Sequence, residues 1–290
     1  MRLALPLLLT VGSFAVGVLV ACGGGDGVTA TKITTPDASA LVDSGSGGPT
    51  DAAATTTDAG TDAGVTSIGC AGQSYLLCDD FESIAAGSPP DTSLWKVNAA
   101  TGAKATVDRT HVAHGNNAVH LSMPKGATNV TLNETKTFPP PAGTDTLFGR
   151  AYFYVPAGTV FPTAHTNFFE GDGKVGNVAG NYRYGLGGGK FFANYNPGDP
   201  GKTSKTAPAV GTWTCLEWEF AGDTNEMHFW VDETELTDVA IPSTGVNGNV
   251  WTAPKFDSLY VGWITYESQQ TVFDVWYDDI AIDVKKIGCH

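Results

Sequence analysis

Short runs of alternating apolar and polar residues recur through this chain from residue 74 to its end. Three of them are Leu147–Val155, Trp213–Phe220 and Val272–Ile282, and Gly, Pro, Asn and Asp separate such runs. No stretch keeps apolar residues at a helical spacing over about eleven positions. Regularly spaced short strands with turn residues between them are typical of β-sandwiches and barrels. The pattern therefore predicts an all-β domain in which two sheets pack together.

The first 22 residues have the features of an export signal. Arg2 precedes an almost wholly apolar run, Leu3–Val20, and small residues lead to a cysteine. The motif Leu19-Val20-Ala21-Cys22 resembles the lipobox of bacterial lipoproteins, in which the cysteine is lipidated and becomes the mature N-terminus. The apolar run is long enough to suggest a transmembrane anchor as the alternative. We predict a signal peptide at 1–21, lipidation of Cys22, and an exported, lipid-anchored protein of the bacterial cell envelope.

A segment without aromatic residues follows, at residues 23–68. It consists mainly of Thr, Ala, Gly, Asp and Ser, and Thr57-Asp58-Ala59-Gly60 is repeated at 61–64. Such a composition cannot bury enough apolar surface to offset the loss of chain entropy. We therefore predict a disordered linker at 22–68, which includes the lipidated cysteine, and a single folded domain at 69–290.

The formal net charge of −14 limits the partners. Binding to phosphate backbones needs clustered Lys and Arg, so a nucleic-acid partner is not expected. Direct docking on anionic lipid is also disfavoured, which leaves the lipid anchor as the expected membrane contact. We expect a monomer whose partner is an extracellular polysaccharide.

Two of the predicted strands carry an unusual outer face. Because side chains alternate along a strand, Phe148, Arg150, Tyr152 and Tyr154 share one side of the strand at 147–155. In the strand at 212–220, one side likewise carries Trp213, Cys215, Glu217 and Glu219. A sheet face that mixes aromatic rings, Arg and Glu is typical of a sugar-binding surface.

Three segments resemble the concanavalin A-like lectin/glucanase jelly roll: Cys78-Asp79-Asp80-Phe81-Glu82, Met227–Asp232 and Val275–Ile282. Within that superfamily the chain is similar to secreted polysaccharide-lyase-like proteins, such as glucuronan lyases and fungal cellulose-induced relatives. The resemblance covers residues 74–290 and implies a two-sheet β-jelly-roll sandwich. It carries less information about chemistry, because one fold hosts many functions.

The resemblance also implies a structural calcium ion, because relatives with these first and last strands often hold one there. Calcium takes oxygen ligands from carboxylates and carbonyls. The predicted ligands are Glu82, Asp278 and Asp279, to which the loop 114–117 can add oxygens. The alternative is that the two aspartates end a strand as solvated acids.

Lyases with this fold typically use Arg, His, Asn or Gln, and Tyr to neutralise a uronate and to move its protons. The predicted catalytic residues are Arg150, His165 and Tyr182, which lie on consecutive segments and are expected to share one cleft. The predicted substrate contacts are Tyr152, Asn167, Tyr184, Tyr195, Glu217, Glu219 and Trp230. The chain lacks the Gln-x-His and Arg-x-Glu-x-Arg strands of alginate lyases. The alternative is that the aromatic residues stack on sugars or fill the core.

Glu217 and Glu219 are also considered as a glycosidase pair, since alternate strand residues share a face and two carboxyl groups can flank a glycosidic bond. The longer Glu-x-Asp-x-Glu strand of related glucanases is absent, so an ordinary polar outer face is the favoured interpretation. Glycoside hydrolysis is therefore less expected than lyase activity.

Four cysteines remain after Cys22, and in an exported chain an even number favours two disulfides. If the first and last strands pair antiparallel, Cys70 comes close to Cys289, which leaves Cys78 for Cys215. A local Cys70–Cys78 bridge is the main rival. No Cys-x-x-Cys pair supports a zinc site.

The expected function is recognition of an extracellular polysaccharide by a surface-tethered protein, with cleavage of a uronic-acid polymer by β-elimination if the protein is an enzyme. The alternative is a non-catalytic carbohydrate-binding or adhesion lipoprotein, and a third interpretation is a structural surface protein without a sugar ligand.

Overall fold

The computed structural model describes residues 69–134, 136–141, 143–249 and 252–290. The predicted signal peptide, the lipidation site Cys22 and the linker therefore lie outside the described residues. No helix in the described part of the chain is long and apolar enough to cross a membrane.

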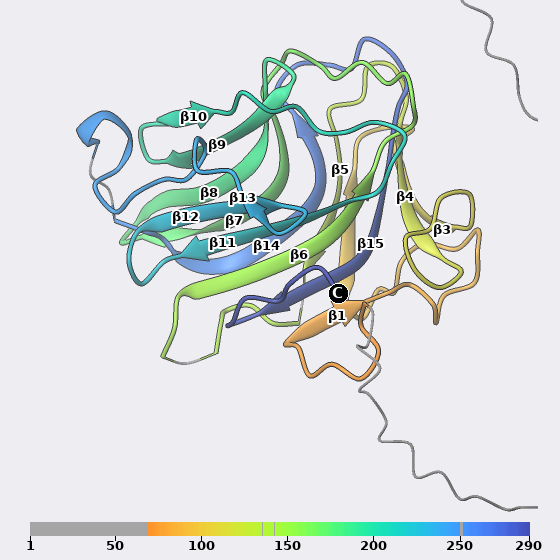
Figure 1. The fold of residues 1–290 in the computed structure, drawn as a ribbon, viewed down its shortest axis with the longest axis horizontal. Helices are drawn as coiled ribbons and strands as arrows, with labels where there is room; N and C mark the ends of the chain where they lie inside the picture. The colour runs from red at the N-terminus through yellow and green to blue at the C-terminus, as the bar shows by residue number, and fades with distance from the viewer. Residues whose placement is uncertain (1–68, 135, 142, 250–251) are drawn as a thin grey trace, which may run out of the picture. The chain divides into compact units, whose positions relative to one another are not determined.

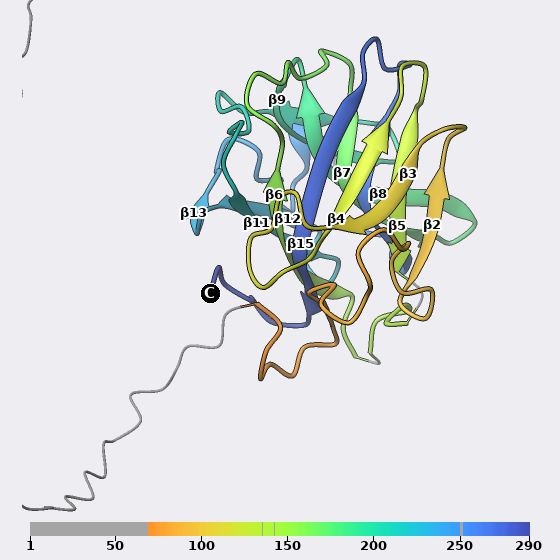
Figure 2. The same cartoon turned by 90° about the vertical axis from the view of Figure 1, so that its right-hand side faces the viewer.

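Two antiparallel sheets make up the domain, and Figure 1 shows them as two layers. Sheet A runs in the order β13 (Thr234–Glu235), β12 (Glu226–Val231), β11 (Thr214–Ala221), β6 (Thr146–Tyr154), β15 (Phe273–Asp283), β4 (Ala118–Met123) and β3 (Lys104–Asp108), and β1 (Leu77–Asp79) also pairs with β15. Sheet B runs in the order β10 (Gly201–Thr203), β9 (Lys190–Asn196), β8 (Val178–Gly187), β7 (Thr166–Val175), β14 (Lys255–Thr265), β5 (Asn129–Glu134) and β2 (Trp95–Ala99). Figure 2 shows β15, β4 and β3 side by side. Within the described residues, the only helical element is a single 3₁₀ turn at Val246–Gly248. The prediction of an all-β jelly-roll sandwich is confirmed.

Strand alternation explains the core between the sheets. In β6 the odd-numbered apolar residues point inward, and in β11 Leu216, Trp218 and Phe220 do so. Trp218 stacks on Phe169 of the opposite sheet, with ring centroids 3.8 Å apart. Gly149 makes room for this indole, because a Cβ there would lie 2.0 Å from a Trp218 ring carbon. The outward residues predicted for both strands do face away from the core.

The cysteine pairing differs from the prediction. The bridges are Cys70–Cys78 and Cys215–Cys289, so the expected Cys70–Cys289 and Cys78–Cys215 pairs are wrong. The expected pairing of the first and last strands is present, since β1 pairs antiparallel with β15, and the segment before β1 meets the C-terminus where Gly69 N–H donates to the His290 carbonyl. However, residues 70–78 form a tight loop closed on itself. The segment after β15 crosses the outer face of sheet A and reaches β11, where Cys215 lies.

Candidate functional site

The outward side chains of sheet B form a continuous polar surface, here called the polar face. It comprises Asn133, Asn167, Glu170, Asp172, Asn181, Arg183, Asn194, Asn196 and Tyr260, together with His165 and Tyr266 at one end. In β8 the alternation is simple, since Tyr182 and Tyr184 point into the core while Asn181 and Arg183 point outward. In β7 a register irregularity between Asn167 and Phe169 brings Asn167 and Glu170 to the same side, although they are three residues apart.

Strand register aligns the middle of this face into one row. Directly opposed residues join β5 to β9 in the order Asn133, Tyr260, Glu170, Arg183 and Asn194. Opposed residues of adjacent strands point to the same side of a sheet. A row of amide, phenol, carboxyl and guanidinium groups therefore runs across the strands, which is a surface suited to many hydrogen bonds with one extended polar ligand.

Arg183 organises one half of the face. Its side chain is only 4% exposed, and it donates through Nη1 to the Tyr266 hydroxyl at 2.8 Å and through Nη2 to Asp199 at 2.7 Å. Asn167 Nδ2 lies 3.4 Å from the same hydroxyl. Tyr266 itself is 58% exposed, and its ring stacks on His165 with centroids 4.9 Å apart. The phenol oxygen of this largely exposed residue is thus held by hydrogen bonds from a guanidinium and an amide.

His165 is neutral at neutral pH, because burial and the nearby Arg183 charge both lower its pKa. Its Nε2 atom is buried and has no hydrogen-bond partner among the described residues. A neutral imidazole beside an exposed phenol can accept or relay a proton.

Two carboxyl groups, Glu170 and Asp172, form the centre of the face. Glu170 accepts hydrogen bonds from Asn167 Nδ2 at 2.7 Å and from Asn181 Nδ2 at 2.8 Å. Burial raises the pKa of Glu170 to about 7, and the neighbouring charge of Asp172 acts in the same direction. Burial also raises the pKa of Asp172. Near pH 7 Glu170 therefore retains its proton in part of the molecules, and a protonated carboxyl can donate to a sugar oxygen.

A cavity of about 290 Å³ adjoins the end of the polar face opposite Tyr266. Its lining includes Asp172, Asn181, Asn196 and Tyr260. The face is therefore hollowed where its polar groups are dense.

The three predicted catalytic residues do not come together. His165 lies at the polar face, but Tyr182 is buried in the core against Phe220 and Phe256. Arg150 lies on the outer side of sheet A, where its guanidinium donates to the carbonyls of Asp279, Gly288 and His290 at 3.2–3.3 Å. The prediction that they share one cleft is wrong. The two sheets lie between Arg150 and His165, and the alternation of side chains along β8 places Tyr182 on the inner side of its sheet.

The predicted substrate contacts are distributed over three places. Asn167 belongs to the polar face. Tyr184 and Tyr195 are core residues, so a role as sugar platforms is excluded by their burial. Four residues lie on the outer side of sheet A: Tyr152, Glu217, Glu219 and Trp230. Of these, Glu217 is buried and accepts the Gly288 N–H at 2.6 Å, while Lys286 lies over the Trp230 ring at 4.1 Å.

The acids predicted to bind calcium converge on one loop. Glu82 and Asp278 each accept two backbone N–H bonds from the loop 113–117, at 2.7–3.2 Å, and His114 Nδ1 lies 2.5 Å from Asp279 Oδ2. Carboxylates suit calcium chemically. However, these oxygens face N–H donors, and no group of three or more His, Cys, Asp or Glu side chains in the described residues is arranged to hold a metal ion. The residue types fit calcium and their arrangement does not.

Comparison with known proteins agrees with the fold. The family described as "Polysacc_lyase-like: Cip1-like, core domain" matches residues 80–285. The chain belongs to this family. Its fold is similar to "Cellulose induced protein, Cip1", with 21% identity, a TM-score of 0.59, and coverage of 74% of this chain and 100% of that one. It is also similar to an endo-β-1,4-glucuronan lyase from the fungus Trichoderma reesei, with 14% identity, a TM-score of 0.53, and coverage of 73% and 96%. No curated protein sequence matches the chain.

Membership of the Cip1-like family supports a polysaccharide-related function, and together with the two disulfides it indicates an extracellular protein. The residues selected from the sequence include His165 and Asn167 of the polar face but not Glu170, Asp172, Arg183 or Tyr266. For Arg183 a signal was present in the sequence. Polar and aromatic residues alternate in Asn181–Tyr184, and the aromatic positions of a sandwich strand usually face the core, which places Asn181 and Arg183 on the outer side.

Proposed function

We propose that this Cip1-like protein binds an extracellular polysaccharide along the polar face and cleaves a uronic-acid polymer there by β-elimination. The observation that carries the proposal is the exposed Tyr266 hydroxyl held at 2.8 Å by Arg183, beside a neutral His165 and an Asn167 amide. Arg, His, Asn and Tyr are the side chains that this chemistry requires, and here they adjoin one another on one surface.

Each step has a candidate group. Arg183 and the amides beside it offset the charge of the substrate carboxylate, which makes the C5 proton more acidic. Tyr266 as a phenolate takes that proton, and the C4–C5 double bond forms as the C4–O4 bond breaks. The bonding pair leaves with O4, which then receives a proton from the Tyr266 phenol. His165 stacks on the Tyr266 ring and positions it.

A non-catalytic carbohydrate-binding role is the second candidate, and the charge of the face favours it. Glu170, Asp172 and Asp199 surround the single guanidinium of Arg183. An acidic surface repels a polyuronate when its carboxyls are ionised, so a neutral glycan would bind without that cost.

A panel of polymers separates the two candidates. The purified domain is incubated with glucuronan, alginate and neutral glucans, and the absorbance of the unsaturated product is followed while binding is measured on affinity gels. Product from a uronic-acid polymer supports the lyase. Retardation on a neutral glucan without product from any polymer supports the binding module, and absence of both contradicts both candidates.

We further propose that Cys22 carries the lipid that tethers the domain to the cell envelope. Support comes from the lipobox-like motif Leu19–Cys22. Metabolic labelling with a radioactive fatty acid is expected to mark the wild-type protein and to fail for Cys22→Ala. Equal labelling of both proteins would contradict the proposal.

A further inference from the structure

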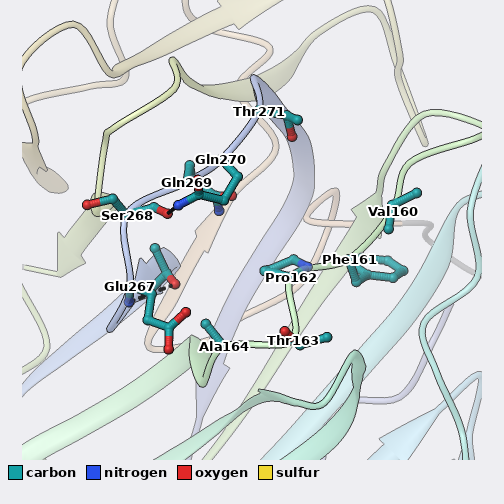
Figure 3. Close-up of a pocket in the computed structure, with 11 residues that line it drawn as sticks. Val160, Phe161, Pro162, Thr163, Ala164, Glu267, Ser268, Gln269, Gln270 and Thr271 are labelled. Atoms are coloured by element: carbon teal, nitrogen blue, oxygen red, sulfur yellow. Dashed lines mark hydrogen bonds between the residues drawn. The ribbon is translucent and has the colours of Figure 1, made fainter. Parts of the chain in front are cut away.

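A second cavity lies beyond the end of the polar face at which Tyr266 stands. It has a volume of about 300 Å³ and is bounded by two segments, 160–164 and 265–271. Figure 3 shows these segments facing each other, with Phe161 and Pro162 on one side and Glu267 to Gln270 on the other. A volume of this size is at the lower end of the range of small-molecule sites.

Gln269 gives this cavity a donor that nothing in the described protein uses. Its side chain lines the cavity and is 5% exposed, and its Nε2 atom is buried without a hydrogen-bond partner among the described residues. The backbone is fixed on both sides, since the Gln269 carbonyl accepts the Gly126 N–H at 2.8 Å and its own N–H donates to Ala127 at 3.0 Å. Leaving a buried donor unpaired costs about 1–3 kcal/mol, so such a group calls for an acceptor from outside the chain.

The mouth of the cavity has apolar surface. Val160 is 86% exposed although it is a large hydrophobic side chain, and the half-buried Phe161 ring lines the same side of the cavity. Sugar rings combine apolar C–H faces with hydroxyl oxygens. An apolar wall opposite one buried donor matches that combination.

The cavity is continuous with the proposed site. Its lining residue Ala164 directly precedes His165, and its lining residue Thr265 directly precedes Tyr266. The two chain segments are joined here, because the Tyr266 N–H donates to the His165 carbonyl at 3.1 Å. A polymer unit bound at Tyr266 therefore has the cavity beside it.

We propose that this cavity is a distal sugar subsite. It takes one unit of the polysaccharide chain, at a position beyond the unit that contacts Tyr266, and Gln269 Nε2 donates to an oxygen of that unit. The inference rests on the proposed function, because the ligand of the cavity is a further unit of the polymer bound along the polar face.

Oligosaccharides of increasing length test the subsite. Binding of β-1,4-glucuronan oligomers is measured by calorimetry for wild type and for Gln269→Leu, which keeps the side-chain volume and removes the donor. We expect equal affinity for oligomers too short to reach the cavity, and an affinity lower by about tenfold for longer ones, equivalent to one lost hydrogen bond of about 1.4 kcal/mol. Gln269→Asn, which retains an amide donor, should recover part of the loss.

A second variant tests the cavity independently, in case Gln269→Leu changes the folding of the protein. Thr163→Trp adds bulk from an exposed position of the cavity lining, and Val178→Trp places the same ring at an exposed site on the β7–β8 hairpin as its control. Thr163→Trp should remove the gain in affinity with length while Val178→Trp retains it. If wild type binds but neither cavity variant changes the length dependence, the subsite is refuted and the proposed function stands. If wild type binds no oligomer of any length, both fail.

Discussion

The outer sides of the two sheets contain similar residues but use them differently. On sheet A, Arg150 donates to three backbone carbonyls, Glu217 accepts the Gly288 N–H, and Asp278 accepts backbone N–H groups of the loop at 113–117. On sheet B, the Tyr266 side chain is largely exposed, while His165 Nε2 is without a partner in the described residues.

The difference lies in what covers each sheet. The segment after β15 crosses the outer side of sheet A and is joined to it by the Cys215–Cys289 disulfide. Charged side chains on that side of the sheet therefore form hydrogen bonds with the backbone of this segment, as Glu217 does with Gly288. The polar face of sheet B adjoins two cavities. Residue type therefore does not separate structural from functional charges, whereas coverage by the rest of the chain does.

The largest expected effect concerns turnover at the polar face. Tyr266→Phe removes the hydroxyl that moves the proton, and we expect at least a hundredfold loss of kcat on the polymer that wild type cleaves, with an almost unchanged Tm. Tyr152→Phe on sheet A is the matched control and should retain activity. If the Tyr152 variant loses activity and the Tyr266 variant does not, the assignment of the active surface to sheet B is contradicted.

Sequence reasoning predicted the sheets better than the site. Alternation at 147–155 and 212–220 assigned the inward and outward residues correctly, because core burial follows strand period. The polar face depends on facts that alternation does not contain. The irregularity at Asn167–Phe169 changes which residues of β7 face outward. Tyr266 meets Arg183 only because β14 and β8 both pair with β7, which lies between them.

The disulfides illustrate the same limit. Pairing of β1 with β15 was predictable from the first and last motifs, but the path of the segment after β15 was not. That path is set by contacts of single residues, such as Gly288 with Glu217 and Lys286 with Trp230.

Removal of the buried cation on sheet A should affect stability rather than turnover. Arg150→Met leaves the carbonyls of Asp279, Gly288 and His290 without their donor. We expect the free energy of unfolding to fall by about 3 kcal/mol and Tm to fall by roughly 6–12 °C, measured by calorimetry. Activity per folded molecule should be unchanged. A loss of activity without a loss of Tm would contradict this structural role and indicate that Arg150 acts in the function.

Calcium tests whether these acids of sheet A bind a metal ion. The carboxyl oxygens of Glu82 and Asp278 already accept backbone N–H groups, and His114 contacts Asp279, so their arrangement does not fit a calcium ion. We therefore expect the same Tm with Ca²⁺ and with a chelator. A rise in Tm on adding Ca²⁺, equivalent to about 2.7 kcal/mol at a concentration a hundredfold above the dissociation constant, would contradict this and show that the acids hold the ion. Glu82→Gln should then weaken that rise.

A further effect is a change of thermal stability with pH that is caused by Glu170 on the polar face. The pKa of Glu170 is raised to about 7, so the folded protein binds this proton more tightly than the unfolded chain does. Its contribution to stability is therefore complete at pH values below the ordinary Glu range and is lost as pH rises towards 7. We expect Tm to be higher at pH 5 than at pH 8.

Glu170→Gln, which keeps a neutral group of the same shape, should flatten that slope by about 1–2 kcal/mol over the interval. Asp278 on sheet A has a pKa raised to about 8 by burial and by the charge of Asp279, and it contributes a slope of the same sign that continues to higher pH. Asp278→Asn therefore serves as the comparison variant. Glucuronan binding should also weaken from pH 5 to pH 8 in wild type and in Asp278→Asn, but less so in Glu170→Gln, because only the polar face meets the polymer. Equal pH dependence of binding in all three proteins would show that the carboxyl pair of sheet B does not face the ligand.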